Sequence, residues 1–224
     1  MLYEVSVALI PLVFAIVLHE IAHGWVANML GDPTAAELGR LSPNPIRHVD
    51  PIGTVALPLV LLLAGAPVFG WAKPVPVEAR RLRNPRLDMV LVALAGPLMN
   101  LFLATLAAIV LGLFFAGAAD ADVQGVSRFI ADNLFNFLVI NIFLAVFNLL
   151  PIPPFDGGHV VEGALPRPLA ARYAELARYG FPVLVLLLLV LPMISPQLNI
   201  VGMAVTPIVQ AIVGVFLGSV GFGS

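Results

Sequence analysis

Cysteine is absent from this chain of 224 residues. Its absence excludes disulfide bonds and thiolate metal ligands, so that any bound metal must use nitrogen and oxygen donors. Charged residues are also scarce, at 11%, whereas a soluble domain would carry about a quarter. The formal net charge is −2, and without a basic excess nothing favours a nucleic-acid partner.

Hydrophobic residues make up 60% of the chain, and the mean hydropathy is +1.03. These values predict an integral membrane protein, a single all-α, multi-pass domain over residues 1–224 with five to six transmembrane helices. The N-terminus lacks the basic region of a signal peptide, so we expect its apolar run to be retained as a span. Apolar runs long enough to cross a bilayer cover about residues 5–30, 51–70, 88–117, 133–152, 175–194 and 198–218.

Basic residues fall on one side of this predicted topology. If the run 51–70 enters and leaves the membrane on the same side, ten of the eleven basic residues share one face, which the positive-inside rule assigns to the cytoplasm. We therefore expect a re-entrant or hairpin element at 51–70, with the N-terminus outside and the C-terminus inside. Hydropathy alone favours the alternative, a full sixth span.

The first apolar run contains His19-Glu20-Ile21-Ala22-His23. On a helix, residues four apart share a face, so His19 and His23 can reach one metal ion while Glu20 reaches a water bound to it. Ionisable groups inside a membrane span are read as functional by default. The alternative is a pair of histidines that satisfy each other or a neighbouring carbonyl.

Asp156 is the natural third metal ligand. A catalytic zinc takes three protein ligands and keeps one open position. The fourth apolar run, which ends in prolines before Asp156-Gly157-Gly158, reaches the cytoplasmic depth that the topology predicts for the two histidines. The alternative is that Asp156 is an ordinary turn residue before two glycines.

These segments resemble the site-2 protease family of intramembrane zinc metalloproteases, in the compact prokaryotic subgroup without a PDZ or CBS domain. The resemblance covers about residues 5–165, and the accessory helices at about 175–218 carry no motif. It rests on HEIAH at 19–23, NLLPIPPFDGG at 148–158, AGPLMN at 95–100, and GRLSPNPIRHVDPIG at 39–53 with GWAKPVPV at 70–77.

The resemblance implies one Zn²⁺ per chain, with His19, His23 and Asp156 as its ligands and Glu20 as the general base. It implies hydrolysis of peptide bonds within or near transmembrane segments of other membrane proteins, with the active site towards the cytoplasmic side of the cell membrane. The bilayer and a transmembrane protein or peptide are then the expected partners. The alternatives are a non-enzymatic metal-binding membrane scaffold or a small transporter. Transporters typically contain repeated broken helices, whereas the His-Glu and Asp-Gly-Gly motifs do not repeat along this chain.

Four further residues are open to two interpretations each. Asn148 can donate to the developing oxyanion or hold the substrate backbone, or it can tie helices together, and the sequence favours neither. For Asn100 the packing role is favoured. His159 could support a metal ligand, but it and His48 are more often surface or loop histidines.

Residues 71–78, Trp-Ala-Lys-Pro-Val-Pro-Val-Glu, lie between the second and third apolar runs. Proline is confined to edge strands, so this stretch could form an edge strand of a small membrane-associated β-sheet that pairs with the substrate backbone. An extended loop stiffened by proline is the equally favoured alternative.

Overall fold

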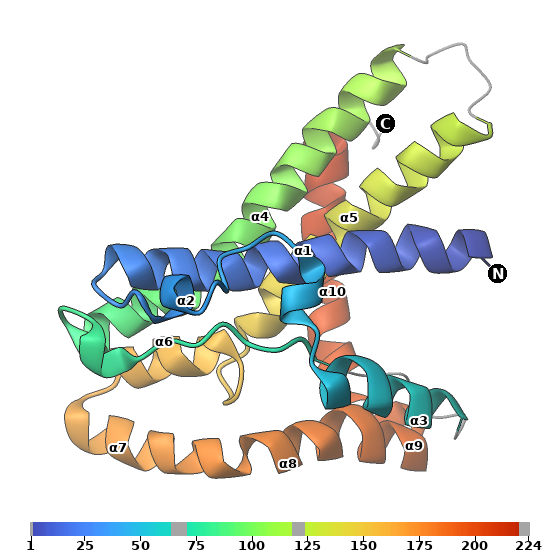
Figure 1. The fold of residues 1–224 in the computed structure, drawn as a ribbon. Helices are drawn as coiled ribbons and strands as arrows, with labels where there is room; N and C mark the ends of the chain where they lie inside the picture. The colour runs from blue at the N-terminus through green and yellow to red at the C-terminus, as the bar shows by residue number, and fades with distance from the viewer. Residues whose placement is uncertain (1, 64–70, 118–123, 220–224) are drawn as a thin grey trace.

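The computed structural model describes residues 2–63, 71–117 and 124–219. The described residues are mostly helical (Figure 1). The α-helices are α1 (Leu2–Met29), α2 (Thr34–Glu37), α3 (Leu57–Leu63), α4 (Pro85–Gly117), α5 (Val126–Asn148), α6 (Asp156–Ala164), α7 (Arg167–Leu176), α8 (Gly180–Val185), α9 (Leu191–Ile194) and α10 (Ile200–Ser219). Short 3₁₀ turns lie at 45–48, 79–81, 177–179 and 196–198, and π turns at 51–56 and 186–190.

Five helices in the described part of the chain are long and apolar enough to cross a membrane. This number confirms the lower of the two predicted counts. The α7–α9 segment is longer than its predicted span, because the more polar helix α7 (Arg167–Leu176) precedes the apolar stretch. The spanning helices are 2–29, 85–117, 126–148, 167–194 and 200–218.

Helices α1, α4 and α5 pack against one another, and α10 packs on α5. Figure 1 shows α1 crossing α4 and α5, with α7–α9 in one line on the far side of α6. Small residues allow close helix approach in membranes, and Ala104, Ala107 and Ala108 of α4 meet Leu138 and Ile142 of α5 in the main buried cluster.

The second apolar run forms no long helix in its described part. Its described part forms a π turn and the short helix α3, and residues 64–70 lie outside the described residues. After them the chain is back where the run began, because the amide of Trp71 donates to the carbonyl of Gly53 at 3.1 Å and the amide of Lys73 to that of His48 at 2.9 Å. The two ends of the run thus lie together, which fits the predicted hairpin element, and its place in a membrane stays a prediction.

Residues 71–78 are extended but form no strand, and the described residues contain no β-sheet. The predicted edge strand is therefore wrong, and the loop alternative holds. Pro74 and Pro76 have no backbone N–H, so that this stretch cannot build a regular ladder.

Arg83 and Arg86, two residues of the predicted basic face, lie at one end of the bundle. The amide of Arg83, before α4, donates to the carbonyl of Leu30, after α1, and Arg86 donates to the carbonyl of Gly163 in α6. At the opposite end, the Tyr3 hydroxyl of α1 donates to Asp132 of α5. Helix α1 is thus parallel to α5 and antiparallel to α4.

Asp32 fastens the loop after α1 to the extended segment. Its carboxylate is fully buried and accepts hydrogen bonds from the Glu78 amide at 2.5 Å, the Thr34 amide at 3.0 Å and the Thr34 hydroxyl. Burial raises the pKa of this carboxyl, but the hydrogen bonds from Thr34 and Glu78 outweigh it and lower the pKa.

We expect Asp32→Asn to destabilise the protein by about 1–3 kcal/mol, because it weakens hydrogen bonds to a buried carboxylate. Because the pKa of Asp32 is lowered in the folded state, its ionised carboxylate stabilises the folded protein at every pH above about 3.9, the ordinary pKa of aspartate. This stabilisation is lost as the pH falls through the lowered pKa. Thermal unfolding in detergent at several pH values measures both effects. Glu175→Gln, on an exposed surface pair, should change little; equal unfolding temperatures for wild type and Asp32→Asn would contradict the prediction.

Candidate metal centre

Three of the predicted site residues meet at one point. His19 and His23 lie one turn apart on α1, and Asp156 is the first residue of α6. The Nε2 atoms of the two imidazoles are 3.0 Å apart. The Asp156 carboxylate lies 3.3 Å from Nε2 of His19 and 3.4 Å from Nε2 of His23, so that one donor atom from each residue falls within 4.8 Å of the others.

Prolines and glycines after α5 bring Asp156 to this point. Helix α5 ends at Asn148, and the chain turns through the proline-rich residues 151–154 before α6 begins at once at Asp156. Gly157 is required there because a Cβ atom would collide with the backbone carbonyl of Leu149. The turn thus lays the start of α6 against the end of α5, with the carboxylate facing α1.

The far nitrogen of each imidazole is held by α4. Nδ1 of His23 is 2.7 Å from the carbonyl oxygen of Val92, and Nδ1 of His19 is 2.6 Å from Oδ1 of Asn100. Gly96 lies between these two contacts, and a Cβ atom there would be closer than 3.0 Å to both rings. Helix α4 therefore packs closely against both imidazole rings and orients their Nε2 atoms towards Asp156.

The arrangement fits a zinc ion. Both histidines are buried, and Oδ2 of Asp156 is buried without a hydrogen-bond partner. A buried polar atom without a partner is costly, and coordination to a metal removes that cost. Two imidazole nitrogens and one carboxylate oxygen are ligands that catalytic zinc takes, and three protein ligands leave a position for water.

Glu20 faces the same cavity, which has a volume of about 340 Å³ and is lined on one side by Pro74, Val75 and Val77. Its Oε2 accepts a hydrogen bond of 2.7 Å from the amide of Val75. Asn148 also lines the cavity, while its Nδ2 donates to the Leu144 carbonyl of its own helix at 3.0 Å. The structure thus places both predicted catalytic residues beside the histidine cluster, and their roles remain predictions.

The remaining predictions concern three residues. His159 lines the cavity, and its Nδ1 lies 3.8 Å from Glu162. His48 is buried away from the cluster, with Nε2 3.0 Å from the carbonyl of Ser42. Asn100, predicted to have a packing role, contacts His19 directly, and the sequence signal that could have revealed this is its place in AGPLMN.

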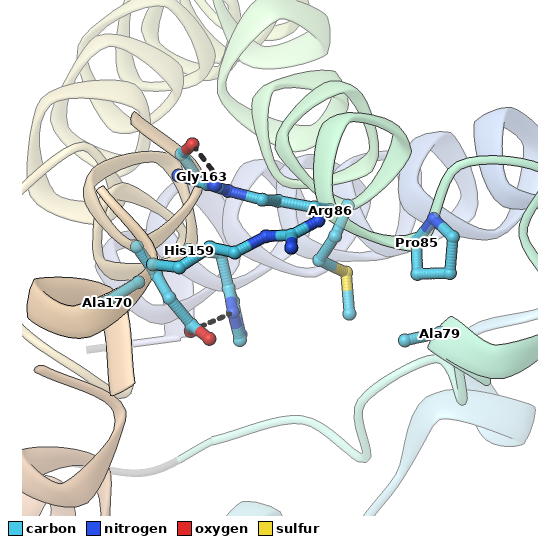
Figure 2. A pocket seen from close by; sticks show the side chains of 9 residues that line it. Ala79, Pro85, Arg86, His159, Gly163 and Ala170 are labelled. Atoms are coloured by element: carbon cyan, nitrogen blue, oxygen red, sulfur yellow. Dashed lines mark hydrogen bonds and ion pairs between the residues drawn. The ribbon is translucent and has the colours of Figure 1, made fainter. Parts of the chain in front are cut away.

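A second cavity of about 420 Å³ adjoins the first, since Met89 and His159 line both. Figure 2 shows Arg86 reaching from α4 to the carbonyl of Gly163 on α6, with His159 below them. Arg167 lines this cavity as well. The space therefore continues from the histidine cluster towards Arg86 and Arg167.

Comparisons with known proteins identify the family of the chain. The model for the family described as Peptidase family M50 matches residues 124–190, which include Asp156. "Putative zinc metalloprotease YwhC" of Bacillus subtilis (strain 168) is 38% identical over 85% of this chain and 84% of that protein.

Two proteins named "Putative zinc metalloprotease Rip2" also match, and the chain covers 64% of each. The protein from Mycolicibacterium smegmatis is 29% identical and that from Mycobacterium tuberculosis is 32% identical, over 81% of this chain in both cases. No solved structure gives a significant match. The chain thus belongs to peptidase family M50, the site-2 protease family, and is a multi-pass membrane zinc metalloprotease.

Proposed function

We propose that this protein is an intramembrane endopeptidase that hydrolyses peptide bonds within or near transmembrane segments of other membrane proteins. The depth of the cluster carries the proposal. His23 lies six and His19 ten residues before the end of α1, which at 1.5 Å per residue puts them about 9 and 15 Å inside the helix end. A site at that depth faces chains that are themselves in the membrane.

His19, His23 and Asp156 are the proposed ligands of one zinc ion. When bound, zinc supplies Lewis acidity and lowers the pKa of a coordinated water. The Glu20 carboxylate is the proposed general base, which takes a proton from water in the cavity and passes it to the nitrogen of the leaving amine. Asn148 has one amide hydrogen beyond its bond to Leu144, and this hydrogen can point to a substrate carbonyl oxygen.

The extended residues 74–77 are the proposed guide for an unwound substrate. A helical substrate hides its carbonyls in its own hydrogen bonds, so it must extend before hydrolysis. Pro74–Pro76 contains a single backbone N–H, that of Val75, and it is bonded to Glu20. The proposed guidance therefore relies on contacts with Pro74, Val75 and Val77 along the cavity wall and not on strand pairing.

We propose that the site opens towards the cytoplasm. The second cavity leads from the cluster to Arg86 and Arg167, and positive residues beside a membrane helix mark the cytoplasmic side. A non-enzymatic scaffold or a transporter explains the buried cluster less well, since the matching relatives are named as metalloproteases.

Cleavage in liposomes tests the proposed substrate class. The purified protein is mixed with a reporter that carries one transmembrane segment and, separately, with an unfolded soluble protein, and mass spectrometry locates the cuts. We expect cuts within or next to the apolar segment, and their loss after a zinc chelator is added. Cuts confined to the soluble chain would contradict the intramembrane proposal while leaving a zinc protease.

A further inference from the structure

Two fully buried asparagines connect α4 and α5 to His19. Oδ1 of Asn100 is 2.6 Å from Nδ1 of His19. Its Nδ2 donates to Oδ1 of Asn141 at 2.8 Å and points to the carbonyl of Ala15 at 3.4 Å. Nδ2 of Asn141 donates in turn to the carbonyl of Phe137 at 2.7 Å. The chain of bonds from Phe137 to His19 thus joins α5, α4 and α1.

The Phe137 carbonyl, at one end of this series of hydrogen bonds, fixes which group donates and which accepts in each of them. A backbone carbonyl can only accept, so the group of Asn141 that faces Phe137 must be its NH₂, and its oxygen must face Asn100. That oxygen also only accepts, so Asn100 must present its NH₂ to Asn141 and its oxygen to His19. Rotating the Asn141 amide by half a turn would set its oxygen against the Phe137 carbonyl and its NH₂ against that of Asn100. Rotating the Asn100 amide would set its oxygen against Oδ1 of Asn141 and the Ala15 carbonyl.

We infer that Asn100 and Asn141 are positioning residues that select the tautomer of His19. An oxygen facing Nδ1 requires the proton on Nδ1, which leaves the lone pair on Nε2 directed at Asp156. His23 reaches the same tautomer through the Val92 carbonyl alone. The inference deepens the proposed function, because it rests on His19 as a ligand.

A matched pair of substitutions at Asn141 tests the inference without touching His19. Threonine at position 141 can donate its hydroxyl to the Phe137 carbonyl four residues back and accept from Asn100. Valine has the same shape and can do neither. Partners of metal-bound histidines are typically worth 10–100-fold in metal affinity, so we expect Asn141→Val to weaken zinc binding by about tenfold and Asn141→Thr to stay near wild type.

Two readouts are measured on the full chain in detergent. Competition with a chromophoric chelator gives the zinc affinity. Nitrogen-15 spectra of the metal-free protein, labelled at its four histidines and held at alkaline pH, report which ring nitrogen of His19 carries the proton. We expect Nδ1–H in wild type and Asn141→Thr, and a mixture of tautomers in Asn141→Val.

Asn136→Val is the control, because Asn136 also lies on α5 and donates to α1, at the carbonyl of Val7, 2.9 Å away. It should leave both readouts unchanged. Equal zinc affinities for the Thr and Val variants at 141, or an equal loss in Asn136→Val, would overturn the inference. Zinc retained by His19→Ala would instead refute the proposed ligand role, while the metal-free spectra would still test the tautomer.

Discussion

Glu20→Gln is expected to lower the rate of peptide hydrolysis by about 10²–10⁴-fold, the usual contribution of a general acid–base group, while zinc stays bound. Glutamine has nearly the shape of glutamate, and its side-chain oxygen can still accept the hydrogen bond that Val75 gives to Glu20. The extended segment beside the cavity should therefore keep its place. What is lost is a group that can take up a proton.

The rate is measured with the transmembrane reporter in liposomes, beside the zinc content of the same preparation. Glu162→Gln is the control, since Glu162 lines the neighbouring cavity but has no proposed part in proton transfer. Its activity should stay within a few-fold of wild type. Full activity in Glu20→Gln with normal zinc content would rule out Glu20 as the base.

Asp156→Ala is expected to remove most of the bound zinc, and with it all activity. The variant leaves two imidazoles, and two protein ligands are fewer than a catalytic zinc site uses. It also removes the carboxylate that stands 3.3 and 3.4 Å from the two Nε2 atoms. Because α6 begins at Asp156 on a turn built by prolines and glycines, the helix should still form without this side chain.

Asp156→Asn separates the loss of charge from the loss of the ligand atom. The amide keeps an oxygen at the same place but is neutral and a weaker donor to zinc. We expect an affinity between those of wild type and Asp156→Ala. An alanine variant that held as much zinc as wild type would show that the third ligand lies elsewhere.

The spans and the cluster were predictable because each depends on a short-range pattern. Five of the six apolar runs correspond to the membrane helices, with boundaries up to about eight residues off where the more polar helix α7 (Arg167–Leu176) precedes the apolar part. The spacing of His19 and His23 sets them on one helix face. The charge distribution put Asp156 at their depth, and the structure brings the three together.

The hydrogen bonds behind the cluster were not predictable, because they depend on how helices pack. Asn100 reaches Asn141 where Ala104, Ala107 and Ala108 let α4 approach α5, and it reaches His19 where α4 packs on α1. No spacing within one helix encodes either approach. The sequence therefore favoured plain packing for Asn100. Likewise, the prolines of 71–78 suited an edge strand and a loop equally, and the hydrogen bonds to neighbouring segments decide for the loop.

Zinc analysis of the purified protein tests the central claim most directly. Wild type, His19→Ala, His23→Ala and Asp156→Ala are compared by elemental analysis after dialysis, with His159→Ala as the control, because His159 lies three residues beyond Asp156 and is paired with Glu162. The account predicts about one zinc per chain in wild type and His159→Ala and nearly none in the other three. Zinc at the wild-type level in any of those three would contradict the proposed site.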